Sequence, residues 1–252
     1  MRLVERSAGS GGKLTEQGRR YHERVTHALS QVAVATIDLM SDPNEHRLRL
    51  WCAPGLASEW LSGRIAAFAS QDPGLDFELQ PVEDAPDFDT READAHLHYV
   101  INGAVPAENP ALRSVEVARP QIFAVASPDY AARTMTIRQP SDLLNSQLLH
   151  EASTDQWRRW FAEHGFLTDA TLIGPKFHQG HLTLAAARRG QGVALANALL
   201  VADDLARGSL VKLGPWAPVY LGGYVLTARR DNWQSRTMTR FRRWLAQSVA
   251  VA

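Results

Sequence analysis

The chain has 252 residues, of which 45% are hydrophobic and 21% are charged, as in ordinary globular proteins with room for two small domains. Its 27 Lys and Arg residues balance its 27 Asp and Glu residues, so it lacks the basic excess of a protein that grips DNA over a broad face. The single cysteine, Cys52, excludes an internal disulfide and a cysteine-built metal site. Neither a secretory signal nor a membrane-spanning apolar run is recognisable, and we expect a cytoplasmic protein.

The first predicted element is a long helix from Leu14 to about Ser41, with Thr15 as its N-cap. At 1.5 Å per residue it would be roughly 40 Å long, which is more than a small domain can cover. We therefore expect its apolar stripe to meet the same stripe of a second copy, the alternative being a helix that packs along its own domain. The stripe consists of the predicted dimerisation residues Tyr21, Val25, Leu29, Val32, Thr36 and Leu39.

From residue 47 onward the pattern alternates between strands and helices, which predicts a parallel sheet with crossover helices. Leu48, Leu50 and Cys52 alternate with polar or exposed positions as in a strand, the next three residues (53–55) indicate a turn, and a helix is expected from Leu56 to Ser70. Further strands are expected near residues 75–79, 95–99, 114–117, 121–126, 147–149, 171–173, 193–196, 210–213 and 219–227, and further helices near 154–164, 179–189, 198–207 and 231–249.

Two interruptions of the strand pattern predict two α/β lobes. Arg119-Pro120 breaks the pattern between two strands, and Trp216-Ala217-Pro218 breaks it again later in the chain. Proline cannot donate a hydrogen bond in a central strand, so these segments are better explained as extended connections between lobes. We expect the chain to cross at about residues 117–121 and to return at about residues 217–222.

The sequence offers few signs of catalysis, cofactor binding or metal binding. His96 and His98 lie on one face of a strand, but no third ligand is recognisable, and a polar strand face is the preferred interpretation. Gly190 and Gly192 follow a helix and precede a strand, which is the order of a helix C-cap and turn rather than of a dinucleotide-binding loop. No nucleophile motif with a partnered base is found. We expect no enzyme activity, no cofactor and no metal.

Two loops are better candidates for a binding site. Residues 54–58 and 150–154 each connect a strand to a helix, and helix N-termini present free N–H groups to carboxylates and other anions. Ligands of open α/β sheets gather at the carboxyl ends of the strands. Both loops would open onto the cleft between two lobes, although Ser58 and Thr154 could equally serve only as caps of their own helices.

The order of several motifs resembles the LysR-type transcriptional regulators. The segments Leu3–Arg6 and Lys13–Arg19 resemble the wing of that family's winged helix-turn-helix. The remaining similarities run in order to the C-terminus, and they are closest to the branch that contains the glycine-cleavage activator and the β-lactamase regulator. They comprise Trp60–Phe68 with Asp72-Pro73, Ser127–Tyr130, Leu148–His150, Ala185–Leu195 and Leu205–Val211.

The resemblance implies an α/β fold, with a type 2 periplasmic-binding-protein-like effector domain of two lobes preceded by a wing remnant and a long linker helix. The implied domains are residues 1–13 (wing), 14–42 (linker and dimerisation helix) and 47–252 (effector-binding domain). Within the last, lobe I would span residues 47–118 and 222–252, and lobe II residues 119–221. Arg6, Lys13 and Arg19 would contact DNA phosphates, which position a protein without specifying sequence. The recognition helix would lie upstream of Met1, so weak or unspecific DNA binding is expected of this polypeptide alone.

The implied function is that of an oligomeric transcription regulator controlled by a small effector in the cleft. Residues 94–100 depart from the family's usual strand, because two histidines are introduced and the terminal glycine is replaced. Glu151 disfavours a purely anionic effector and favours an amine, so an amino acid is the hypothesis. The alternatives are a solute-binding protein of a transport system, an enzyme on an α/β scaffold, and a dimerisation partner without DNA binding of its own. The candidate effector-binding residues are Pro54, Leu56, Ser58, Tyr99, Phe123, Glu151, Ser153, Gln179 and Asn197.

Overall fold

The computed structural model describes residues 4–7, 10–22, 24–26, 46–104, 109–133 and 137–250. Its contacts divide the chain into two units, residues 1–45 and residues 46–252. In the first unit, β1 (Val4–Ser7) pairs antiparallel with β2 (Ser10–Leu14), and residues 16–22 and 24–26 are helical. The Thr15 hydroxyl accepts a hydrogen bond from the Gly18 amide at 3.0 Å, which confirms the predicted N-cap.

The described helical residues of this unit cover only part of the predicted long helix. Tyr21 and Val25 are exposed there. The remaining predicted dimerisation residues, Leu29, Val32, Thr36 and Leu39, lie outside the described residues.

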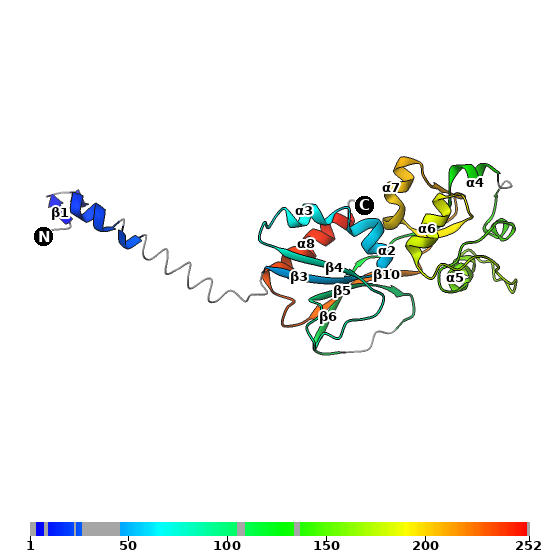
Figure 1. The fold of residues 1–252 in the computed structure, drawn as a ribbon, viewed down its shortest axis with the longest axis horizontal. Coiled ribbons are helices and arrows are strands. Elements are labelled where there is room, and N and C mark those ends of the chain that lie inside the picture. Colours follow the sequence, from blue (N-terminus) through cyan, green and yellow to red (C-terminus); the bar gives the residue numbers. More distant parts are fainter. Residues whose placement is uncertain are drawn as a thin grey trace. The chain divides into compact units, whose positions relative to one another are not determined.

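The second unit begins with a five-stranded sheet in the order β4-β3-β5-β10-β6 (Figure 1). The parallel sheet predicted from the sequence is correct for β3, β4 and β5, which pair in parallel, but wrong for β10, which runs antiparallel to β5 and β6. The reason is that β10 enters the sheet through an extended connection, without a crossover helix to reverse the chain. The strands are β3 (Arg47–Cys52), β4 (Asp76–Pro81), β5 (Ala95–Ile101), β6 (Leu112–Ala118) and β10 (Gly222–Arg229).

Helices cover one face of this sheet (Figure 1). Leu48 and Leu50 alternate with less buried neighbours and are buried under these helices, where Phe68 meets Phe241 edge-on with ring centroids 5.4 Å apart. The turn predicted at residues 53–55 is wrong, because Pro54 starts a helix, as proline does readily in the first helical position. The helices are α2 (Pro54–Leu56), the π-helix η1 (Ala57–Leu61), α3 (Ile65–Ala69) and α8 (Arg236–Ala250).

A smaller, antiparallel sheet follows in the order β8-β7-β9, so the parallel arrangement predicted for this region is wrong. The strands predicted near residues 147–149 and 171–173 are wrong as well. Leu148 and His150 form only isolated bridges, with Val193 and Lys176, and residues 171–173 form no regular strand. The elements of this part are β7 (Ile122–Ala126), α4 (Pro128–Arg133), the 3-10 helix η2 (Pro140–Asn145), α5 (Asp155–Glu163), α6 (Gly180–Arg188), β8 (Ala194–Asn197), α7 (Ala198–Arg207) and β9 (Val211–Lys212).

We name the two parts of this unit by their sheets. The five-stranded half comprises β3 to β6, β10, α2, η1, α3 and α8, and the three-stranded half comprises β7 to β9, α4 to α7 and η2. The chain connects the halves twice, and the two connections meet where the Ile122 amide donates to the Val219 carbonyl at 2.8 Å. The second connection is also held by the Asn102 amide, just after β5, which donates to the Leu221 carbonyl at 2.9 Å.

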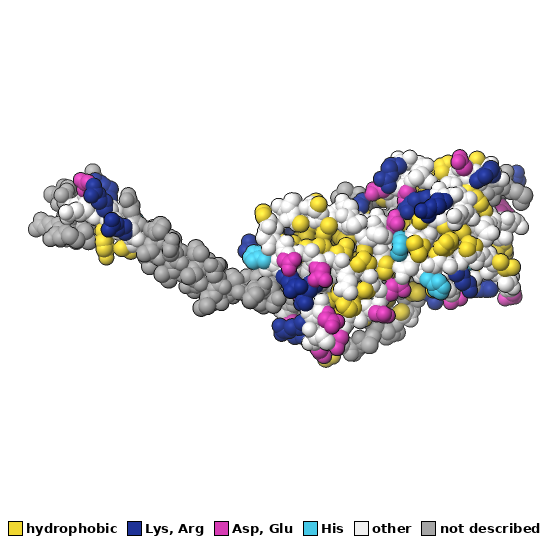
Figure 2. All heavy atoms as spheres, viewed as in Figure 1, with side chains coloured by type: hydrophobic (Ala, Val, Ile, Leu, Met, Phe, Trp, Pro, Cys, Tyr) yellow, Lys and Arg dark blue, Asp and Glu magenta, His cyan; other side chains and the backbone are white. Residues whose placement is uncertain are grey.

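The halves also share apolar packing. The larger cluster of buried side chains extends from Trp60 and Leu61 of η1 to Leu184 of α6 and Leu200 of α7. The smaller cluster lies within the three-stranded half around Trp157 and Trp160, and the crossing segments contribute to it. Acidic and basic side chains are interspersed on the face of residues 46–252 shown in Figure 2. Among the described residues, no helix has the length and apolarity needed to cross a membrane.

Candidate small-molecule cavity

A cavity of about 340 Å³ lies between the two halves, which is within the size range of small-molecule sites. The three parallel strands of the five-stranded half supply its wall from their carboxyl ends. Residues 53–55 follow β3, Glu83 follows β4, and Tyr99 and Ile101 close β5. The opposite wall comes from residues 151–156, the start of α6 and the β8–α7 junction. The location is therefore the one expected for a ligand of an α/β fold.

A chain of side-chain contacts fixes the floor of the cavity. Tyr99 packs edge-on against Tyr224, with ring centroids 5.2 Å apart. The Tyr224 hydroxyl accepts a hydrogen bond from the Asn197 amide nitrogen at 2.9 Å, and the Asn197 amide oxygen accepts one from the Leu200 backbone N–H at 3.2 Å, which caps α7. Asn197 therefore uses both ends of its amide inside the protein.

Tyr99 differs from its neighbours because its hydroxyl is buried and has no hydrogen-bond partner among the described residues. Burial and the negative charge of Glu151 raise the Tyr99 pKa to about 12, so the hydroxyl keeps its proton at neutral pH. It can then donate one hydrogen bond and accept others. An unsatisfied buried hydroxyl is costly, and a ligand in the cavity would satisfy it.

Glu151 is the most buried of the three acidic residues that line the cavity, since Glu83 and Asp155 are exposed. Its burial and the charge of Glu83 raise its pKa, and a hydrogen bond from Gln156 only partly opposes this. The carboxylate lies beside the first turn of α6, where a Cβ atom built on Gly180 would come within 3.0 Å of Oε1. The glycine therefore leaves the space that Glu151 occupies.

Five of the nine predicted effector-binding residues line the cavity: Pro54, Tyr99, Glu151, Ser153 and Asn197. The structure places the other four elsewhere. Leu56 is buried in the core, and the Ser58 hydroxyl donates to the Gly55 carbonyl at 3.4 Å on the exposed side of the helix. Leu56 lies in α2 and Ser58 in η1, within the helical region expected from residue 56 onward, and neither side chain lines the cavity.

Phe123 and Gln179 are each one residue away from a cavity-lining position. Ile122 and Gly180 line the cavity instead. In a strand, a shift of one residue moves a side chain to the opposite face, and the Phe123 ring accordingly packs under the Lys212 ammonium group, 4.3 Å from the ring centroid. Gln179 is the N-cap residue of α6 and makes no side-chain cap hydrogen bond.

The sequence reasoning missed Glu83, Asp155, Gln156 and Arg159, which also line the cavity. The last three lie at the start of α5, where Arg159 is four residues from Asp155 and three residues from Gln156, the spacings of neighbours on a helix surface. That spacing was present in the sequence. Glu83 lies in an irregular segment after β4, and no sequence signal could have placed it there.

The alternative that Ser58 and Thr154 serve only as helix caps is not seen, since neither makes a side-chain cap hydrogen bond. Gly190 does follow α6 with a positive φ of 71°, as the C-cap interpretation predicts.

The two histidines of β5 form a stacked pair, with ring centroids 4.4 Å apart. Burial and the neighbouring His98 lower the His96 pKa to about 4, and burial lowers the His98 pKa as well. Within the described residues no group of three metal-ligating side chains is found.

Comparisons with known proteins agree with this geometry. The family model "LysR substrate binding domain" matches residues 41–250. The glycine cleavage system transcriptional activator of Escherichia coli K12 is 27% identical over 238 residues, which cover 94% of this chain and 76% of that protein. The HTH-type transcriptional regulator TrpI of Pseudomonas aeruginosa is 30% identical over 252 residues, which cover 96% of this chain and 81% of that protein.

Solved structures of regulators share the fold. The effector domain of AmpR from P. aeruginosa superimposes with a TM-score of 0.67 at 26% identity, and the match covers 81% of this chain and 96% of that domain. CrgA from Neisseria meningitidis superimposes with a TM-score of 0.65 at 19% identity, and the match covers 98% of this chain and 84% of CrgA. Residues 46–252 thus have the type 2 periplasmic-binding-protein-like α/β fold of an effector-binding domain, and the chain belongs to the LysR family of transcriptional regulators.

Proposed function

We propose that an amino-acid-like effector binds in the cavity between the two halves and thereby controls transcription through this chain. The observation that supports this most directly is the cavity itself, which combines apolar walls with the unsatisfied Tyr99 hydroxyl and the Glu151 carboxylate. An ammonium group would satisfy both, and Arg159 is available for a carboxylate.

The mechanism is a shift between conformational populations. A ligand that touches both halves favours the arrangement to which it binds best, and the arrangement of the halves determines how copies of the chain pack together. This mechanism makes and breaks no covalent bond. The proposed role is that of a cytoplasmic regulator and not that of an enzyme. We further propose that lobe I comprises residues 47–118 and 222–252, and that lobe II comprises residues 119–221.

The proposal assigns self-association and DNA contact to the N-terminal unit. Tyr21 and Val25 are 57% and 36% exposed on its helix, which leaves apolar surface for a second copy. Arg6, Lys13 and Arg19 are proposed to contact phosphates. The protein would act as a homodimer or tetramer, and sequence-specific DNA binding would need a recognition helix that the described residues do not include.

Titration calorimetry of the full chain against a panel of amino acids tests the effector. We expect saturable heat from at least one of them, and a loss of affinity of tenfold or more in Glu151→Gln or Tyr99→Phe. Glu163→Gln, at an exposed position of α5, serves as the control and should bind as the parent does. Absence of heat with every amino acid would refute an amino-acid-like effector.

Light scattering after size-exclusion chromatography tests the oligomer. The double variant Tyr21→Asp, Val25→Asp should shift the mass toward the monomer, whereas Arg24→Ala on the same helix should not. An unchanged mass in the double variant would contradict a dimer contact through this stripe.

A further inference from the structure

We infer that the effector is a diamino acid with a net positive charge, such as lysine or ornithine, whose inner ammonium group is held by Glu151 and Tyr99. The inference rests on the proposed function and makes it more specific. The charged side chains that line the cavity are three carboxylates and one guanidinium group. The charged lining residues are Glu83, Glu151, Asp155 and Arg159.

Other buried carboxylates of residues 46–252 are paired with arginine side chains. Asp94 pairs with Arg49, Asp204 pairs with Arg188, and Asp72 pairs with Arg240, and the side chains of these three acids are at most 17% exposed. Burying a charge is costly unless a partner of opposite charge is present, so this pairing is expected.

Glu151 departs from that pattern. It is partly buried, it repels Glu83, and within the described residues it has no cationic partner. Glu151 lines the cavity together with Ala152 and Ser153, so a ligand in the cavity can supply the missing cation. A bound ammonium group would offset the cost of the buried charge and contribute three N–H donors.

Tyr99 completes the inner subsite. Its hydroxyl is buried and unpartnered among the described residues, and it lines the same cavity as Glu151. An ammonium group held between the two could donate to both oxygens. A carboxylate in the same place would be repelled by Glu151 and Glu83, which excludes a dicarboxylate effector such as glutamate.

The rest of the cavity accounts for the other groups of the ligand. Glu83 and Asp155 are exposed at its edge, where they can pair with a second ammonium group, and Arg159 on the same face of α5 can pair with a carboxylate. Ile101, Leu200 and Leu221 line the space between and suit a chain of methylene groups. Two ammonium groups, one carboxylate and a short aliphatic chain describe a diamino acid.

The test compares L-lysine with L-norleucine, which has the same carbon chain without the second amine, and with L-glutamate. Calorimetry on the full chain should give lysine at least tenfold tighter binding than norleucine, with no measurable binding of glutamate. Glu151→Gln should weaken the binding of lysine until its preference over norleucine is less than threefold, and Glu83→Gln with Asp155→Asn should weaken the binding of both amino acids, because both carry the α-ammonium group. Glu163→Gln is the matched control and should leave both affinities unchanged.

Each outcome has a distinct consequence. Norleucine binding as tightly as lysine, with the binding lost in Glu151→Gln, would overturn the diamino acid and leave the effector site in place. Tighter binding of glutamate would overturn the charge argument. If none of these amino acids gave heat, the proposed amino-acid effector would fall with it.

Discussion

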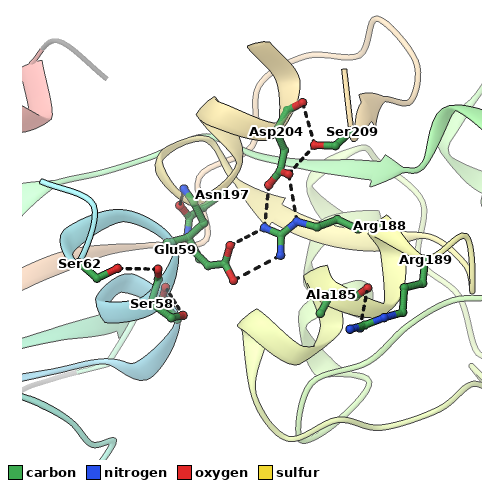
Figure 3. Close-up of polar contacts among 11 residues, drawn as sticks. Ser58, Glu59, Ser62, Ala185, Arg188, Arg189, Asn197, Asp204 and Ser209 are labelled. Carbon is green, nitrogen blue, oxygen red and sulfur yellow. Dashed lines mark hydrogen bonds and ion pairs between the residues drawn. The ribbon is translucent and has the colours of Figure 1, made fainter. Parts of the chain in front are cut away.

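Glu59 of η1 and Arg188 of α6 form an ion pair between the two halves of residues 46–252 (Figure 3). Arg188 simultaneously binds Asp204 of α7 through two hydrogen bonds, from Nε at 3.0 Å and from Nη2 at 2.7 Å. Asp204 is held in turn by the Ser209 hydroxyl at 2.6 Å. A planar guanidinium group has five N–H donors in a fixed fork, so it can pair with one carboxylate through two hydrogen bonds and still reach a second carboxylate.

We expect Arg188→Met to lower the free energy of unfolding by about 2–4 kcal/mol, because two partly buried carboxylates lose their shared partner. Arg189→Met, at the C-cap of α6, is the matched control, since the Arg189 side chain is exposed and donates to the Ala185 carbonyl (Figure 3). It should change stability by less than about 0.5 kcal/mol. Urea unfolding of both variants measures the difference, and equal losses would show that the Arg188 network does not stabilise the fold.

Glu151→Gln should stabilise the free protein at pH 7 by about 1 kcal/mol, because it removes a partly buried charge that lacks a cation. Burial and Glu83 raise the Glu151 pKa above its ordinary value of 4.5. The protonated group therefore favours the folded state, and that stability is lost as the pH rises from about 4.5 through the raised pKa.

Thermal unfolding between pH 4 and pH 8 checks this sign. The gap between Glu151→Gln and the parent should widen with pH, while Glu163→Gln should follow the parent throughout. A constant gap would mean that Glu151 does not titrate differently in the folded state.

Gly222→Ala should destabilise the protein by more than about 2 kcal/mol, because the added Cβ would lie 2.2 Å from the Val100 carbonyl oxygen and 2.8 Å from the Tyr99 ring. Gly63→Ala places its Cβ in open space and should be neutral or slightly stabilising. Guanidinium unfolding curves compare the two. A tolerated Gly222→Ala would show that β5 and β10 can move apart at the cavity.

Asn197→Ala should cost about 2–3 kcal/mol, because α7 loses its cap and the Tyr224 hydroxyl loses a buried partner. Asn197→Asp retains an acceptor at the start of α7, where the helix dipole favours an anion, and should cost less. Thermal denaturation of the two variants measures the ranking. The reverse order would indicate that burial of the new charge outweighs the cap.

The sequence predicted correctly those features that depend on neighbouring residues in the chain, and it failed for features that depend on contacts between distant segments. The apolar periodicity of α7 and its C-cap glycine, Gly208, lie within one short segment. The predicted bounds of this helix, residues 198–207, agree with the structure. The long insertion between β6 and β10 is signalled by Pro120 and Pro218, which cannot serve in central strands. The direction of β10 is not local, because it depends on which sheet the chain re-enters and from which end.

The cavity shows the same division. Tyr99 and Glu151 could be placed because each ends or follows a predicted strand. The turn predicted at residues 53–55 was wrong because a proline fits both a turn and a first helical turn, and packing of α2 against α6 and α7 favours the helix. Phe123 was misplaced by a single residue of strand register, which no pattern of consecutive apolar residues can define.

The position of β10 has a consequence for synthesis on the ribosome. β10 lies between β5 and β6 in the sheet, yet it follows them by more than a hundred residues, so these two strands have no shared neighbour while the nascent chain is still growing. The three-stranded half is one uninterrupted stretch from β7 to β9, and all of it is synthesised before β10. The effector cavity, whose floor includes Tyr224 of β10, is therefore among the last features of the molecule to form.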